Sequence, residues 1–230
     1  MAEAFNSTPA PLYKSLALKQ HFAALEREPK NAPIMLYGDS QMSRWPVEEL
    51  RRTFGNIDVI NLGVSGDRSQ NSLWRLERTK KEDYAPKAII LSEGANNVSD
   101  NEPACAIASG IRAVISELRS SWPDATVIVL KTLPRGDNFS QADDTHREVY
   151  DIVSSTLDPK TFIVDVGEAM TCGGMRQFPQ SYYDLKWRTG KAPSPCKYFE
   201  DDLVHISKQG YADIVGPAVI KQLVEIGQID

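Results

Sequence analysis

The sequence predicts an α/β protein, a three-layer αβα sandwich of flavodoxin-like type with a five-stranded parallel sheet. Two observations lead to this prediction. Short, almost continuously apolar runs are typical of strands that are covered on both faces, and five of them occur here, at residues 34–37, 57–62, 88–91, 126–130 and 162–166. These runs alternate with helical stretches, which implies a parallel sheet between two helical layers, joined by right-handed crossovers.

The helical stretches are predicted from apolar residues that recur at helical spacing. The first covers residues 11–27, and the others cover about 46–54, 68–80, 102–121, 143–157 and 207–226. Residues 1–10 are rich in small residues and proline, so we expect a flexible tail there. Residues 11–230 are expected to form a single domain, since 230 residues suit one α/β domain.

Composition and charge argue against several classes of protein. The net charge is −5, whereas nucleic-acid-binding proteins usually present a basic face. No run of 18 apolar residues is present, so no integral membrane association is expected. The N-terminal residues lack the basic and apolar regions of a secretory signal, which favours a cytoplasmic location.

Three cysteines are present, at positions 105, 172 and 196. None of them has the CxxC spacing of a zinc site, and we expect neither a metal nor another cofactor. A disulfide between Cys172 and Cys196 is conceivable because both lie in one irregular segment. The sequence favours free thiols, since nothing else in it indicates an oxidising compartment.

The irregular segment covers residues 167–200, which show no clear periodicity. Structureless segments of this length are uncommon in compact domains and are often functional. One interpretation is a lid or a wall of the substrate site, and the other is a packed surface excursion or an oligomer contact, which would suit a homodimer. Its aromatic residues are Phe178, Tyr182, Tyr183, Trp187, Tyr198 and Phe199.

A candidate nucleophile follows the first predicted strand. Ser40 comes directly after Gly38 and Asp39, at the carboxyl end of that strand, where open α/β sheets place reactive groups. A serine hydroxyl needs a base to remove its proton. Asp and Ser are also common helix caps, so these residues alone do not establish a nucleophile.

The candidate base is one of three histidines. His21 lies within the first predicted helix, and His146 lies in a polar helical stretch that suggests a solvated face. His205 lies just before the last helix, three residues after Asp202, and this spacing lets the carboxylate reach the imidazole. Asp201 is a competing partner for the imidazole.

Two further motifs follow the second and third predicted strands. Gly66 lies in a glycine-containing turn that exposes backbone amides, and Asn96 offers a side-chain amide. Together with the Ser40 amide, these groups would make a three-donor oxyanion hole, in which each donor typically contributes about 3 kcal/mol to transition-state stabilisation.

The order Ser, Gly, Asn and Asp-x-x-His along successive strands resembles the SGNH (GDSL-like) hydrolase superfamily. The resemblance spans about residues 33–215 and is closest to the catalytic subunits of platelet-activating-factor acetylhydrolase and their bacterial relatives. It departs from the usual pattern at Gln41, where GDSL proteins have Leu, and at Leu203, where Gly is usual. The blocks that carry the likeness are GDS at 38–40, NLGVSGD at 61–67, LWRL at 73–76, GANN at 94–97, TLPRG at 132–136 and DLVH at 202–205.

The resemblance implies a metal-free serine esterase with Ser40, His205 and Asp202 as its triad and short acyl esters, often acetyl, as substrates. We expect a small-molecule or carbohydrate ester, with a lysophospholipid or thioester of longer chain, acyl transfer, or binding without catalysis as alternatives. Aromatic rings can stack on sugar faces and polar groups can bind hydroxyls. The candidate substrate contacts are Asp39, Asn97, Arg135 and Trp187.

Overall fold

The computed structural model describes residues 1–175 and 177–229 and contains the predicted parallel sheet. The strand order is β2-β1-β3-β4-β5, and every neighbouring pair is parallel. The three-layer α/β prediction is therefore confirmed. The strands are β1 (Ile34–Gly38), β2 (Val59–Asn61), β3 (Ala88–Ser92), β4 (Thr126–Leu130) and β5 (Thr161–Val164).

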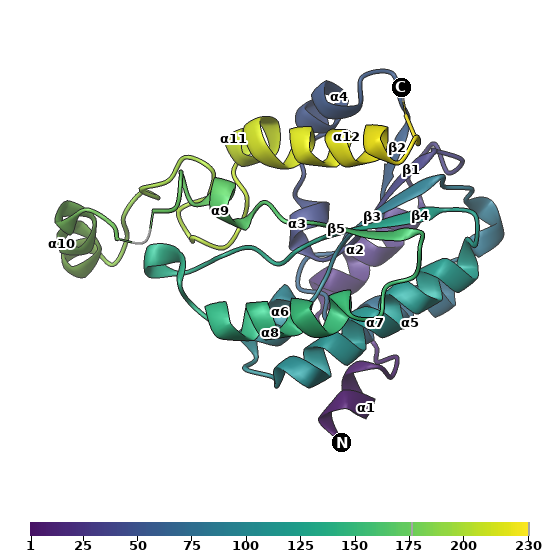
Figure 1. The fold of residues 1–230 in the computed structure, drawn as a ribbon, viewed down its shortest axis with the longest axis horizontal. Helices are drawn as coiled ribbons and strands as arrows, with labels where there is room; N and C mark the ends of the chain where they lie inside the picture. The colour runs from purple at the N-terminus through teal and green to yellow at the C-terminus, as the bar shows by residue number, and fades with distance from the viewer. Residues whose placement is uncertain (176, 230) are drawn as a thin grey trace.

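Helices cover both faces of the sheet (Figure 1). One layer contains α2 (Ser15–Leu25), α5 (Ser69–Arg78), α7 (Ala104–Ser121) and α8 (Asp143–Ser154). The other contains α4 (Val47–Phe54) and α12 (Gly216–Glu225), which lie above the sheet in the view of Figure 1. Both faces of the central strands are buried, which explains why those strands read as continuous apolar runs.

The two faces of the sheet contribute to separate hydrophobic cores, because successive side chains of a strand point to opposite faces. In β1, Met35 and Tyr37 pack into the core beneath α5 and α7. Ile34 and Leu36 pack into the core beneath α4 and α12. The sheet is thus held from both sides, and the loops at the carboxyl ends of its strands are built on a rigid base.

The last predicted helix is divided into three successive helical elements. Where one helix was predicted over 207–226, α11 (Lys208–Gly210) passes into a π-helical turn at Tyr211–Val215 and then into α12. Among the described residues, no helix is both long enough and apolar enough to cross a bilayer.

Residues 1–10, expected to be a flexible tail, contain helix α1 (Ala2–Asn6), which packs against α7. The Asn6 side chain is buried and its amide donates a hydrogen bond to the Glu102 carboxylate. The Ala10 amide donates to the Gln70 carbonyl at 2.9 Å. Polar contacts rather than apolar periodicity hold this segment, which is why a hydrophobic pattern did not reveal it.

The segment 167–200 contains two helices, α9 (Gly167–Met170) and α10 (Gln180–Thr189). Phe178 and Phe139 pack edge to face with their ring centroids 5.1 Å apart. Cys172 and Cys196 form a disulfide, which corrects the expectation of free thiols. Helix α10 projects away from the sheet, at the left end of Figure 1.

Candidate active site

The first predicted site motif forms a sharp turn at the end of β1. Gly38 has a φ of +116°, and a Cβ atom at this position would lie 1.9 Å from the carbonyl oxygen of Ser92 in β3. Only glycine therefore fits here. The Asp39 carboxylate then caps α3 (Ser40–Ser43) by accepting a hydrogen bond from the Gln41 amide at 2.9 Å. This turn places Ser40 at the start of a helix beside the carboxyl ends of the strands.

Three side chains from distant parts of the chain form a continuous hydrogen-bonded row at this edge. His205 Nε2 lies 3.0 Å from Ser40 Oγ, and His205 Nδ1 lies 2.6 Å from Asp202 Oδ2. The predicted nucleophile, base and carboxylate are thus brought together. The arrangement matches what a hydroxyl needs to be deprotonated by an imidazole that a carboxylate orients.

The loop that carries His205 is organised by the Asp202 carboxylate. Asp202 Oδ1 accepts hydrogen bonds from the amides of Val204 at 3.0 Å and His205 at 2.9 Å. Burial raises the pKa of Asp202, but the hydrogen bonds from His205 and Val204 outweigh it and hold the pKa below its usual range. Asp201, the competing candidate, instead accepts a hydrogen bond from the Ser194 amide.

Gln41 explains one departure from the usual GDSL pattern. Its side-chain amide donates to the Val204 carbonyl at 2.9 Å, and its oxygen accepts from the Ile206 amide at 3.3 Å. Gln41 is buried, so these bonds span an interior contact between the nucleophile helix and the histidine loop. Apolar periodicity does not reveal this role of Gln41, although a polar residue at a position that is usually apolar is a detectable signal.

Leu203 explains how the second departure is accommodated. Its φ is +56°, a left-handed conformation that favours glycine, and its side chain is buried in the core on the α12 side of the sheet. Burying a leucine contributes roughly 1.5–3 kcal/mol. The left-handed conformation costs roughly 1–2 kcal/mol. Packing therefore offsets the backbone strain at this position.

The expected oxyanion donors lie on neighbouring loops. Gly66 has a φ of +86° in the turn after β2. Asn96 is in the first turn of α6 (Ala95–Ser99), which follows β3, and its side-chain amide donates to the Asp67 carbonyl at 2.7 Å. One amide hydrogen of Asn96 remains for another acceptor.

Two expected substrate contacts, Asp39 and Asn97, are corrected by their burial. Neither side chain is exposed. Asn97 bonds to the Glu102 carboxylate at 2.9 Å and to Gln70 at 3.2 Å. Burial raises the pKa of Asp39 to about 7, against the hydrogen bonds that it accepts. Both residues support the loops from behind and do not face a ligand.

The other two expected contacts lie in contrasting environments. Arg135 is buried and is held against α6 by hydrogen bonds to the Ser99 hydroxyl at 2.6 Å and the Ala95 carbonyl at 2.5 Å. It therefore supports the Asn96 helix. Trp187 is 91% exposed on α10, in the projecting part of the 167–200 segment.

The remaining histidines do not join the site. His146, expected on a solvated face, is buried, and burial next to Arg135 and Lys131 lowers its pKa to about 4. His21 is also buried, with a pKa lowered to about 4 by burial and by nearby arginines. Within residues 1–175 and 177–229, no group of three or more His, Cys, Asp or Glu side chains is arranged to hold a metal ion.

Comparison with known proteins identifies the family that this chain matches. Residues 30–212 match the model of the GDSL-like lipase/acylhydrolase family. The platelet-activating factor acetylhydrolase IB subunit alpha1 of Rattus norvegicus is 31% identical over 143 residues, which are 62% of this chain and 60% of the relative. The matched part is thus less than two thirds of that relative's length.

Two solved structures share the fold. A GDSL-like lipase from Bacteroides thetaiotaomicron superposes with a TM-score of 0.63 and 15% identity, covering 90% of this chain and 97% of that chain. Est24, a carbohydrate acetylesterase from Sinorhizobium meliloti, superposes with a TM-score of 0.60 and 13% identity, covering 84% of this chain and 98% of that chain.

Proposed function

Because the chain belongs to the GDSL-like lipase/acylhydrolase family, we propose that it hydrolyses carboxylic esters through a Ser40–His205–Asp202 triad. The observation that carries this proposal is the row of hydrogen bonds from the Ser40 hydroxyl through the imidazole to the Asp202 carboxylate, at 3.0 and 2.6 Å. Both ring nitrogens of His205 have partners in this row. Nε2 faces the Ser40 hydroxyl, which loses the proton, and Nδ1 faces the Asp202 carboxylate, which stabilises the imidazolium.

The proposed reaction passes through an acyl-enzyme. His205 Nε2 takes the Ser40 proton while Ser40 Oγ attacks the ester carbonyl, and the imidazolium then protonates the departing alkoxide. Water, deprotonated by the same nitrogen, attacks the acyl group and releases the acid and free Ser40. Asp202 keeps the imidazole in the required tautomer and orientation throughout.

Charge develops on the carbonyl oxygen in this reaction, and three donors are proposed to stabilise it. They are the backbone amides of Ser40 and Gly66 and the side-chain amide of Asn96. Ser40 is the first residue of α3 and Gly66 lies in a turn with positive φ, positions at which amides are free of helix and strand hydrogen bonds.

The proposed substrate is a short acyl ester, and an acetyl group on a carbohydrate is the leading candidate. The likeness to a carbohydrate acetylesterase supports a sugar as the alcohol portion.

The test compares Ser40→Ala with wild type in hydrolysis of p-nitrophenyl acetate and in labelling by an organophosphonate. We expect the variant to lose labelling and at least about 1,000-fold in kcat, since the nucleophile is absent. Ser155→Ala, an exposed serine after α8, is the matched control and should retain both properties. Wild-type turnover by Ser40→Ala would refute the triad.

A chain-length series of p-nitrophenyl esters tests the acyl preference separately. We expect activity to be highest with acetyl and to fall as the chain lengthens. Highest activity at eight carbons or more, roughly the length at which an apolar channel becomes necessary, would instead favour a lysophospholipase or thioesterase.

A further inference from the structure

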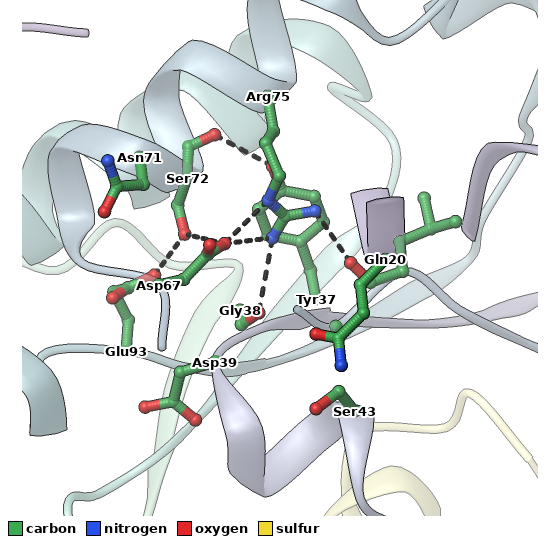
Figure 2. A network of polar contacts seen from close by, with 12 residues as sticks. Gln20, Tyr37, Gly38, Asp39, Ser43, Asp67, Asn71, Ser72, Arg75 and Glu93 are labelled. Atoms are coloured by element: carbon green, nitrogen blue, oxygen red, sulfur yellow. Dashed lines mark hydrogen bonds and ion pairs between the residues drawn. The ribbon is translucent and has the colours of Figure 1, made fainter. Parts of the chain in front are cut away.

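The guanidinium of Arg75 is fully buried between the loops that carry the candidate active site (Figure 2). It contacts the Asp67 carboxylate at 2.6 Å, the Leu62 carbonyl at 2.8 Å and the Gly38 carbonyl at 3.2 Å. The ring of Tyr37 lies 4.4 Å from its central carbon. One planar group therefore joins two backbone carbonyls and one side-chain carboxylate, which come from three positions in the chain.

These three positions have a common relation to the proposed chemistry. Leu62 and Asp67 are the two ends of the loop that contains Gly66, and Asp67 follows Gly66 directly. Gly38 is the end of β1, two residues before Ser40. The rigid fork of an arginine can hold several acceptors in fixed geometry, which a lysine ammonium cannot do. Arg75 thus fixes the glycine loop against the strand that leads to the nucleophile.

The same network reaches the other oxyanion donor through Asp67. The Asp67 carbonyl accepts the hydrogen bond from the Asn96 side chain, while its carboxylate accepts from Arg75 and lies 3.3 Å from the Ser72 hydroxyl oxygen. The Ser72 hydroxyl donates to the Glu93 carboxylate, as Figure 2 shows. Asp67 therefore connects the guanidinium to the donor on α6.

Burying such a charged network is costly, because the charged groups lose their contacts with water. Replacing a buried ion pair by apolar residues is therefore often neutral or stabilising. Its cost is consistent with a role beyond packing. We propose that Arg75 is a positioning residue for ester hydrolysis, which holds the Gly66 amide and, through Asp67, the Asn96 amide in register with Ser40. This inference rests on the proposed function.

The test measures the kcat and KM of the Arg75→Lys variant. The kcat is calculated per competent active site, and these sites are counted by complete titration with an organophosphonate. We expect kcat for p-nitrophenyl acetate to fall about 10- to 100-fold, up to the effect of one lost oxyanion donor, with KM changed less than about threefold. Affinity for a small alkylboronic acid, which forms a tetrahedral adduct on Ser40, should fall by the same factor as kcat/KM. Arg78→Lys, in the same helix with an exposed side chain, is the matched control.

The readouts distinguish positioning from mere stability. A purely structural role would lower the number of titrated sites but leave turnover per site and boronate affinity at wild-type values, and that result would overturn the proposal. If Arg75→Lys does not fold, Asp67→Asn decides by the same measurements, since it keeps the side-chain volume and removes the charge. Failure of the triad itself would appear as full activity of Ser40→Ala, independently of either variant.

Discussion

Replacing Glu93 by Gln should make the protein more stable at alkaline pH and leave it almost unchanged at acidic pH. Glu93 is fully buried at the end of β3, where its carboxylate accepts hydrogen bonds from the Gly94 amide at 3.0 Å and from Ser72. Burial, together with the nearby carboxylates of Asp39 and Asp67, raises the pKa of Glu93 to about 8.

The sign and size of the effect follow from linkage. A carboxyl whose pKa is raised in the folded state contributes its stability below its ordinary pKa of 4.5, and that contribution is lost as the pH rises through about 8. The change from 4.5 to about 8 corresponds to a loss of up to about 5 kcal/mol. Glutamine resembles the protonated acid and does not ionise, so Glu93→Gln avoids the loss.

The assay is urea unfolding at pH 5, 7 and 9, followed by tryptophan fluorescence. The free energy of unfolding of Glu93→Gln should exceed that of wild type at pH 9, and the difference should shrink toward zero at pH 5. Glu82→Gln, at an exposed position, is the control and should show no such trend. A Glu93→Gln variant that is equally or less stable than wild type at pH 9 would show that ionisation of Glu93 does not destabilise the fold.

Three further predictions concern the oxyanion donor, the disulfide and a buried histidine. Asn96→Ala should lower kcat about 100-fold with little change in KM, and an unchanged kcat in steady-state assays would exclude this donor. The Cys172–Cys196 disulfide closes a loop with a sequence separation of 24, so replacing both residues by Ser should lower the free energy of unfolding by about 3 kcal/mol. A melting temperature that does not change when the disulfide is reduced by an excess of dithiothreitol, about 10 mM, would contradict this prediction. The pKa of His21 is lowered to about 4, so its stabilising contribution is present above pH 6.5 and falls by up to about 3 kcal/mol as the pH drops to 4. His21→Phe should reduce this acid sensitivity, and unchanged pH dependence in unfolding titrations would count against it.

The disulfide also bears on where the protein works. Disulfides persist in oxidising compartments and are rare in the reducing cytosol. The Cys172–Cys196 pair is thus a bond of the kind that an oxidising environment maintains.

The pattern of apolar and polar residues was enough to predict the layered architecture and the edge of the sheet at which the candidate site lies. Apolar runs identify strands that are buried on both faces, and parallel strands bring their carboxyl ends to one edge. The order of Ser40, Gly66, Asn96 and His205 along the chain therefore predicted that they lie near one another. Their catalytic roles remain predictions.

The partners and the burial of the polar side chains became known from the folded chain. It selected Asp202 over Asp201 beside His205, buried Asp39 and Asn97 behind the loops, and placed the guanidinium of Arg75 among three backbone segments. The physical reason is that periodicity reports only whether a position is apolar. Whether a polar group lies in the interior depends on hydrogen-bond partners from distant segments, which only the folded chain brings within reach.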